Sequence, residues 1–186
     1  RKFAEENGIP MQNFGLLNVA LTHTSYANEH KNEVIHDNER LEFLGDAVLD
    51  LVVGEYLFLR FPDWPEGELT RAKASVVCKP ACAECAAKFH VGDYMLLGKG
   101  EEMSGGRSRV SILGNAFEAV IGAIYLDNNY EVASRFILGH MKKFLDLVDR
   151  GEYDHDYKTD LQEIVQKHGD VDIHYEVVRD EGPDND

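Results

Sequence analysis

The chain has 186 residues, enough for one well-packed domain and a small appendage, and its 44% hydrophobic and 28% charged residues are ordinary for a soluble protein. No apolar run approaches the roughly 20 residues that cross a bilayer, and the first ten residues lack the apolar core of a signal peptide. Three cysteines fit a reducing compartment. We therefore expect a cytoplasmic protein without a membrane partner. The formal net charge of −15 argues against nucleic-acid binding, unless divalent cations neutralise carboxylates at the contact.

Apolar residues recur at helical spacing through residues 1–150, without convincing period-2 alternation, so the sequence predicts an all-α domain of seven or more helices there. We expect loops at 28–37 and in the Gly-rich stretch 91–109. The clearest helix candidates, in chain order, are 38–60, 68–78, 80–89, 111–126 and 131–148.

The composition changes after residue 150. Residues 151–186 hold 12 acidic and 3 basic residues, a net charge of −9, against −6 for 1–150. A capping box at 159–162 precedes a helical stripe, and 173–178 is strand-like. The sequence therefore predicts a second, α+β domain over 156–186, of which a first helix and a first strand are present.

Carboxylates gather on one face of the helix predicted over 38–60. At 100° per residue, Glu39, Glu42 and Asp46 fall within an arc of about 60°. Leucine and valine residues, including Leu51, collect on the opposite side. We expect this helix to be buried over most of its circumference, carboxylates included.

The helix predicted over 111–126 carries two polar side chains in an otherwise apolar stretch, Asn115 and Glu118, on one face. An ionised carboxylate in such surroundings needs a cation, and residues 113–124 contain no Lys or Arg. One candidate is a divalent metal shared with the first helix, since oxygen ligands without His or Cys favour Mg²⁺ or Mn²⁺.

The alternative is that these acids are helix-terminal charges or partners of Arg40, Arg71 or Lys73. The residues alone leave both alternatives open.

Residues 39–47, Glu-Arg-Leu-Glu-Phe-Leu-Gly-Asp-Ala, resemble the signature of the ribonuclease III family over its whole length. Four further segments resemble that family in the same order: 21–26, 66–70, 105–107 and 112–127. Beyond them, residues 157–163 and 181–184 resemble the start of a double-stranded-RNA-binding domain. The resemblance covers essentially the whole chain.

The resemblance implies an all-α endonuclease domain that acts as a homodimer on double-stranded RNA, in rRNA and mRNA processing. It implies Mg²⁺, for which Mn²⁺ can substitute, and products with 5′-phosphate and 3′-hydroxyl ends and short 3′ overhangs. In this chain it implies Glu42, Asn115 and Glu118 as metal ligands and Asp46 and Glu118 as catalytic residues.

The same resemblance gives Glu39 and Glu66 supporting roles. We also expect Arg107 and Arg109 to contact RNA phosphates from the Gly-rich loop.

Position 115 departs from the family, which has Asp there. Asn offers a metal a neutral carbonyl oxygen but removes one negative charge. A natural variant that keeps activity, a substitution made to inactivate the enzyme and a naturally weakened site all fit the sequence. The alternative function is therefore a family member that binds structured RNA without cutting it.

Other chemically suggestive residues have plainer interpretations. Cys78, Cys82 and Cys85 are expected to be small buried residues rather than zinc ligands, because no fourth ligand has suitable spacing. His23 is expected to be structural and Asp50 to be a supporting or solvated acid.

Overall fold

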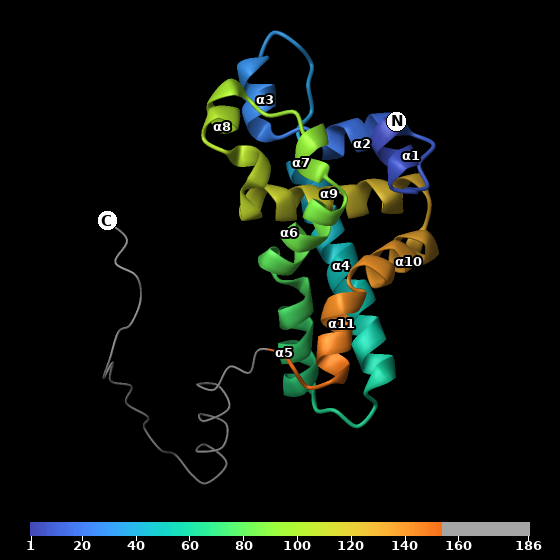
Figure 1. Ribbon diagram of the computed structural model, residues 1–186. Coiled ribbons are helices and arrows are strands. Elements are labelled where there is room, and N and C mark those ends of the chain that lie inside the picture. Colours follow the sequence, from blue (N-terminus) through green and yellow to red (C-terminus); the bar gives the residue numbers. More distant parts are fainter. Residues whose placement is uncertain (154–186) are drawn as a thin grey trace, which may run out of the picture. The chain divides into compact units, whose positions relative to one another are not determined.

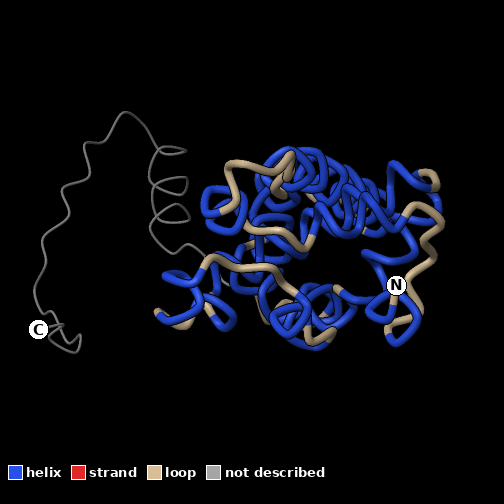
Figure 2. The backbone as a smooth tube through the Cα atoms, turned by 90° about the horizontal axis from the view of Figure 1, so that it is seen from above, coloured by secondary structure: helices blue, strands red, loops and turns tan. Residues whose placement is uncertain are grey.

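A computed structural model describes residues 1–153, which form one unit, and the second domain predicted over 156–186 lies outside the described residues. Residues 1–153 consist of helices and connecting loops, and their β-type pairing is an isolated bridge between Thr22 and Leu96 (Figures 1 and 2). The all-α prediction is confirmed for this part of the chain.

Some helix ends coincide with local sequence signals. Asn13 and Asn129 cap helices by accepting backbone hydrogen bonds, and the long fourth helix ends at Phe61-Pro62. The elements are α1 (Lys2–Glu6), α2 (Phe14–Ala20), α3 (Thr24–Glu29), α4 (Glu39–Arg60), α5 (Glu66–Val77), α6 (Lys79–Lys88), α7 (Val91–Tyr94), α8 (Lys99–Met103), the 3₁₀ turn η1 (Gly106–Ser108), α9 (Val110–Asp127), α10 (Tyr130–His140) and α11 (Lys142–Asp149).

Helix α9 is the centre of the core. It packs most extensively against α4 and α6 and also contacts α2 and α10 (Figure 1). From Ile112 to Ile124 every residue except Asn115 is buried. By length and composition α9 could also cross a membrane, but 67% of it is buried inside the protein, as expected for a core helix.

Two predicted element boundaries are wrong. The expected loop 91–109 contains α7, α8 and η1, which are too short to produce a periodic signal in the sequence. The expected helix 131–148 is two helices that meet at Met141, whose side chain is fully buried in the core. Position 141 is neither glycine nor proline, and the neighbouring Gly139 lies within α10, so no local breaker stands at the junction.

The predicted burial of α4 is also wrong in part. Glu39 and Asp46 are exposed and Glu42 is half-buried, although all three were expected inside. Phe43 and Leu51, which are large and apolar, are exposed as well. The reason is that α4 is buried chiefly along the side that faces α9, so much of its remaining surface faces solvent.

Candidate active site

Two glycines bring α4 and α9 into backbone contact. A Cβ atom on Gly45 would lie 1.7 Å from the carbonyl oxygen of Glu118, and one on Gly122 would lie 2.4 Å from the carbonyl oxygen of Leu41. Any side chain at either position would force the helices apart. Because Gly45 lies between Glu42 and Asp46 in the signature, this crossing brings the acidic face of α4 next to Glu118.

The ammonium group of Lys79 lies at the centre of the site. Its Nζ atom donates hydrogen bonds to Asn115 Oδ1 at 2.8 Å and to both Glu118 carboxylate oxygens, at 2.8 and 3.0 Å. Glu42 Oε1 lies 3.8 Å from the same nitrogen. The three residues predicted as metal ligands therefore converge on one cation position.

Lys79 is the cationic partner that the buried Glu118 requires, and the sequence did not predict it. Of the candidates taken from the sequence, Lys73 pairs with Asp50 at 2.7 Å and Arg71 pairs with Glu68 at 2.6 Å. Lys79 is the first residue of α6, directly before Pro80. The available signal was weak: a lysine between an apolar stretch and a proline, remote in sequence from both acidic helices.

The electrostatics of the site follow from burial. The Glu118 side chain is only 3% exposed, and this burial raises the pKa of its carboxyl group, against the opposing effect of Lys79. Burial also raises the pKa of Glu42, and the charges of Glu39 and Asp46 act in the same direction. Asp46 therefore lies close enough to interact with the two carboxylate ligands, Glu42 and Glu118, while its own side chain is exposed.

The donor set consists of oxygen atoms, which suits a hard divalent cation. Within residues 1–153, no group of three His, Cys, Asp or Glu side chains is placed to hold a metal. The oxygen donors around Lys79 are the carboxylates of Glu42 and Glu118 and the amide oxygen of Asn115. This set does accept a cation, because it binds the Lys79 ammonium.

The remaining predicted site residues have other partners. Glu66 begins α5, is exposed and accepts a hydrogen bond from Thr70. Arg107 donates to Glu102 and to the carbonyl oxygens of Gly92 and Met95. Neither Glu66 nor Arg107 contacts the Lys79 cluster, which consists of Lys79, Glu42, Asn115 and Glu118.

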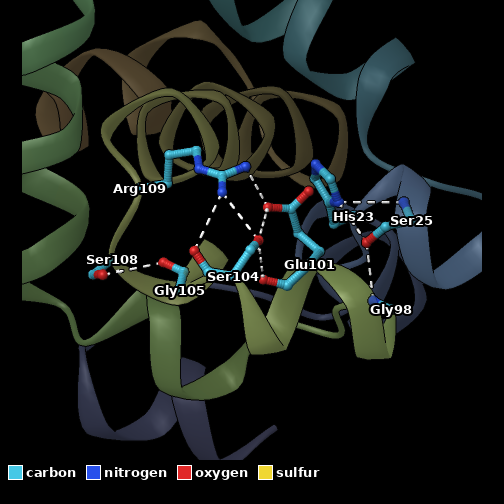
Figure 3. A network of polar contacts seen from close by, with 8 residues as sticks. All are labelled: His23, Ser25, Gly98, Glu101, Ser104, Gly105, Ser108 and Arg109. Carbon is cyan, nitrogen blue, oxygen red and sulfur yellow. Dashed lines mark hydrogen bonds and ion pairs between the residues drawn. The ribbon is translucent and has the colours of Figure 1, made fainter. Parts of the chain in front are cut away.

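Arg109 belongs to a network of hydrogen bonds within the Gly-rich segment. Figure 3 shows its guanidinium group between Glu101 and Ser104, to which it donates hydrogen bonds. On the neighbouring segment, Ser25 Oγ accepts from the Gly98 amide and contacts His23 Nδ1 (Figure 3). His23 also caps α3, which is the structural role expected for it.

The three cysteines are free thiols, and no disulfide bond is present within residues 1–153. Cys82 and Cys85 are buried, as predicted, whereas Cys78 is only partly buried. Burial raises the pKa of the Cys85 thiol to about 11.

Comparison with known proteins gives one consistent result. A family described as Ribonuclease-III-like matches residues 13–145. Ribonuclease 3 of Enterococcus faecalis is 48% identical over 184 residues, which are 98% of this chain and 79% of that protein.

Solved structures agree with this match. The nuclease domain of ribonuclease III from Campylobacter jejuni is 42% identical, with a TM-score of 0.69 over 76% of this chain and 92% of that one. A second structure of the same domain has a TM-score of 0.70 and 41% identity, covers 77% of this chain and 96% of that one, and is described as flexible in a region involved in dimer formation. The chain therefore belongs to the ribonuclease III family of endoribonucleases.

Proposed function

We propose that this protein is a cytoplasmic, divalent-metal-dependent endoribonuclease that cleaves double-stranded RNA in rRNA and mRNA processing. Its proposed products carry 5′-phosphate and 3′-hydroxyl ends with short 3′ overhangs. The observation that carries the proposal is the convergence of Glu42, Asn115 and Glu118 on one cation position at the crossing of α4 and α9.

In this proposal, the oxygens of Glu42, Asn115 and Glu118 hold Mg²⁺, or Mn²⁺ in its place. The bound ion supplies Lewis-acid polarisation of the scissile phosphate and of the attacking water. Glu118 is anchored on the core helix, so its carboxylate oxygens are fixed and shielded from bulk water. Asp46 lies at the exposed edge, where a carboxylate oxygen can accept the proton that the water releases.

RNA binding would rely on the shape and backbone of the duplex rather than on base sequence. The side chains of Arg107 and Arg109 are 37% and 45% exposed, so each can contact a phosphate while remaining tied to its loop. Bound divalent cations would offset part of the repulsion between this acidic chain and RNA.

A homodimer is part of the same proposal. Phe43 is 80% exposed on the signature helix and borders an open hollow of about 870 Å³, whose lining includes Leu16, Val19, Leu44 and Leu126. An exposed aromatic side chain beside a hollow whose lining is largely apolar suits the self-complementary contact that a two-fold interface requires. Dimer formation of the related C. jejuni domain supports this assignment.

A second candidate function is supported by the charge of the site. Two carboxylates, one ammonium and one neutral amide give the Lys79 cluster a net charge of only −1. This is a weak attraction for a divalent cation. The alternative is therefore a family member that binds structured RNA without cutting it.

Cleavage of a long RNA duplex in Mg²⁺ and in Mn²⁺ tests the two functions. We expect Glu118→Ala to lower the cleavage rate by at least about 100-fold, because it removes a ligand of the proposed ion. Asn115→Asp is expected to raise the rate, because it restores a negative charge beside Lys79. Glu84→Ala, on the surface of α6, is the control and should leave the rate unchanged.

Cleavage that survives Glu118→Ala would overturn the assignment of the site. No cleavage by the unaltered chain, together with strong cleavage by Asn115→Asp, would overturn RNA cleavage as the function of this chain and favour the RNA-binding alternative.

A further inference from the structure

We infer that Lys79 is the built-in counter-ion of the site and that a divalent cation must displace its ammonium group before it can bind. This inference rests on the metal dependence proposed above and adds a residue that sets the strength of metal binding.

All three donors of the Lys79 ammonium are used within the site. They correspond to the contacts with Asn115 Oδ1 and with Glu118 Oε1 and Oε2, each 3.0 Å or shorter. These are the same oxygens that would hold the metal. A divalent cation and an ammonium group repel each other, so the two cannot share these oxygens at such distances.

The two partners differ in their access to solvent. The Glu118 side chain is 3% exposed, so water cannot stabilise its charge when the lysine leaves. The Lys79 side chain is 38% exposed and has a long, flexible stem, so its ammonium group can move out into water. The lysine is therefore the mobile partner, and an incoming metal ion takes over the neutralisation of Glu118.

Gly114 provides the space in which Lys79 lies. A Cβ atom at this position would be 2.4 Å from Lys79 Cδ and 3.0 Å from Lys79 Cγ. Glycine in the middle of a helix is less favourable than alanine. The absence of a side chain at Gly114 thus permits the lysine to cross α9 and reach Glu118.

The affinity of the 186-residue chain for Mn²⁺ alone, measured by isothermal titration calorimetry, tests this inference. Removing the competing ammonium in Lys79→Met should lower the Kd for Mn²⁺ by about tenfold or more. Without metal, the same variant should lose about 5 °C or more in Tm, because Glu118 is left buried and unpaired, and added Mn²⁺ should restore that loss.

Lys73→Met is the matched control. It makes the same change of charge. Lys73 lies on α5 and pairs at 2.7 Å with Asp50, which lies on α4, the helix that also carries Glu42. The Kd of Lys73→Met for Mn²⁺ should stay within about twofold of the original, because Asp50 is not one of the proposed ligands.

Gly114→Ala provides a second variant that keeps every charge. Its new methyl group should push the Lys79 side chain away from Glu118 and should also lower the Kd for Mn²⁺. An unchanged or higher Kd in both Lys79→Met and Gly114→Ala would overturn the inference while leaving the metal site in place. If neither the original chain nor any variant binds Mn²⁺, the proposed metal dependence fails, and the inference fails with it.

Discussion

Glu118 has an ammonium partner at 2.8 Å, yet its pKa lies above the ordinary glutamate value of 4.5. Burial of the carboxylate disfavours its charged form more than Lys79 favours it. The negative charges of Asp46 and Glu42 add to the effect of burial. Burial therefore outweighs the lysine in its effect on the pKa of Glu118.

This raised pKa has a consequence for stability. The folded protein holds the Glu118 proton more tightly than the unfolded chain does, so protonation favours folding. We expect the contribution of Glu118 to the free energy of unfolding to decrease as the pH rises from about 4.5 towards neutrality in metal-free buffer. Glu118→Gln, which stays neutral, should remove this decrease, as measured by urea unfolding across that pH range with a chelator present.

Glu84→Gln is a control with the opposite sign. Hydrogen bonds from Lys143 and Lys88 lower the pKa of Glu84, so its contribution to stability is present above about pH 4.5 and is lost on acidification. Unfolding free energies of the original chain and Glu118→Gln that differ by a constant amount at every pH would show that burial of Glu118 does not perturb its titration.

Much of the site could be predicted from residue types and spacing. The carboxylates on α4 and the polar pair on α9 were identified because charged groups in apolar helices require a partner. Lys79 was missed, because its role depends on how α6 packs beside α9 and on the space at Gly114. The exposure of Asp46 was missed for a similar reason, since helical spacing places it on a face but does not show what covers that face.

At the level of elements, the site depends on how closely α4 and α9 approach. Gly45 and Gly122 are not needed for an unusual backbone conformation, because neither has a positive φ angle. They are needed because each faces a carbonyl oxygen of the other helix. The same contact that closes the core therefore sets the spacing of Glu42 and Glu118.

Gly45→Ala tests this packing. Alanine favours helix formation, but its methyl group would overlap the Glu118 carbonyl, so we expect a loss of about 2 kcal/mol or more in the free energy of unfolding. Gly54→Ala, on the same helix, is the control. A Cβ atom there has its nearest neighbour at 3.9 Å, so we expect a gain of up to about 1 kcal/mol. Chemical denaturation measures both, and equal effects would contradict the role assigned to the crossing.

The long helices were easier to predict than the short ones. Residues 38–60 and 111–126 agree with α4 and α9 to within one residue at each end, because their apolar residues recur over many turns. The helices α7 and α8 have only four and five residues, too few to show a period. They depend on contacts such as those of Arg107 with the Gly92 and Met95 carbonyl groups, which no local pattern reveals.

At the scale of the whole molecule, the apolar surface of α4 is the most conspicuous feature of the described part. Phe43 and Phe58 are 80% and 67% exposed on this one helix. Phe43 borders the hollow described above, whereas Phe58 does not line it. A dimer interface that buries Phe43 would therefore include α4, the helix that also carries Glu42 and Asp46.

We expect Phe43→Asp to convert the proposed dimer into a monomer, because a carboxylate cannot enter an apolar interface without a partner. Phe58→Asp makes the same chemical change on the same helix outside the hollow and should leave the dimer intact. Sedimentation velocity of both variants beside the original chain measures the difference. A dimer that persists in Phe43→Asp would place the interface elsewhere.

The backbone contact between α4 and α9 also determines how the protein opens. The two helices are far apart in the sequence, so their contact is non-local and forms only when most of the domain has folded. We expect the amide groups around Gly45 and Gly122 to be protected from hydrogen exchange until the whole unit unfolds. We expect faster exchange in the segment around Arg109, which is held by hydrogen bonds and an ion pair at the surface. We therefore expect Glu118, on the buried helix α9, to lose its position only when the core unfolds.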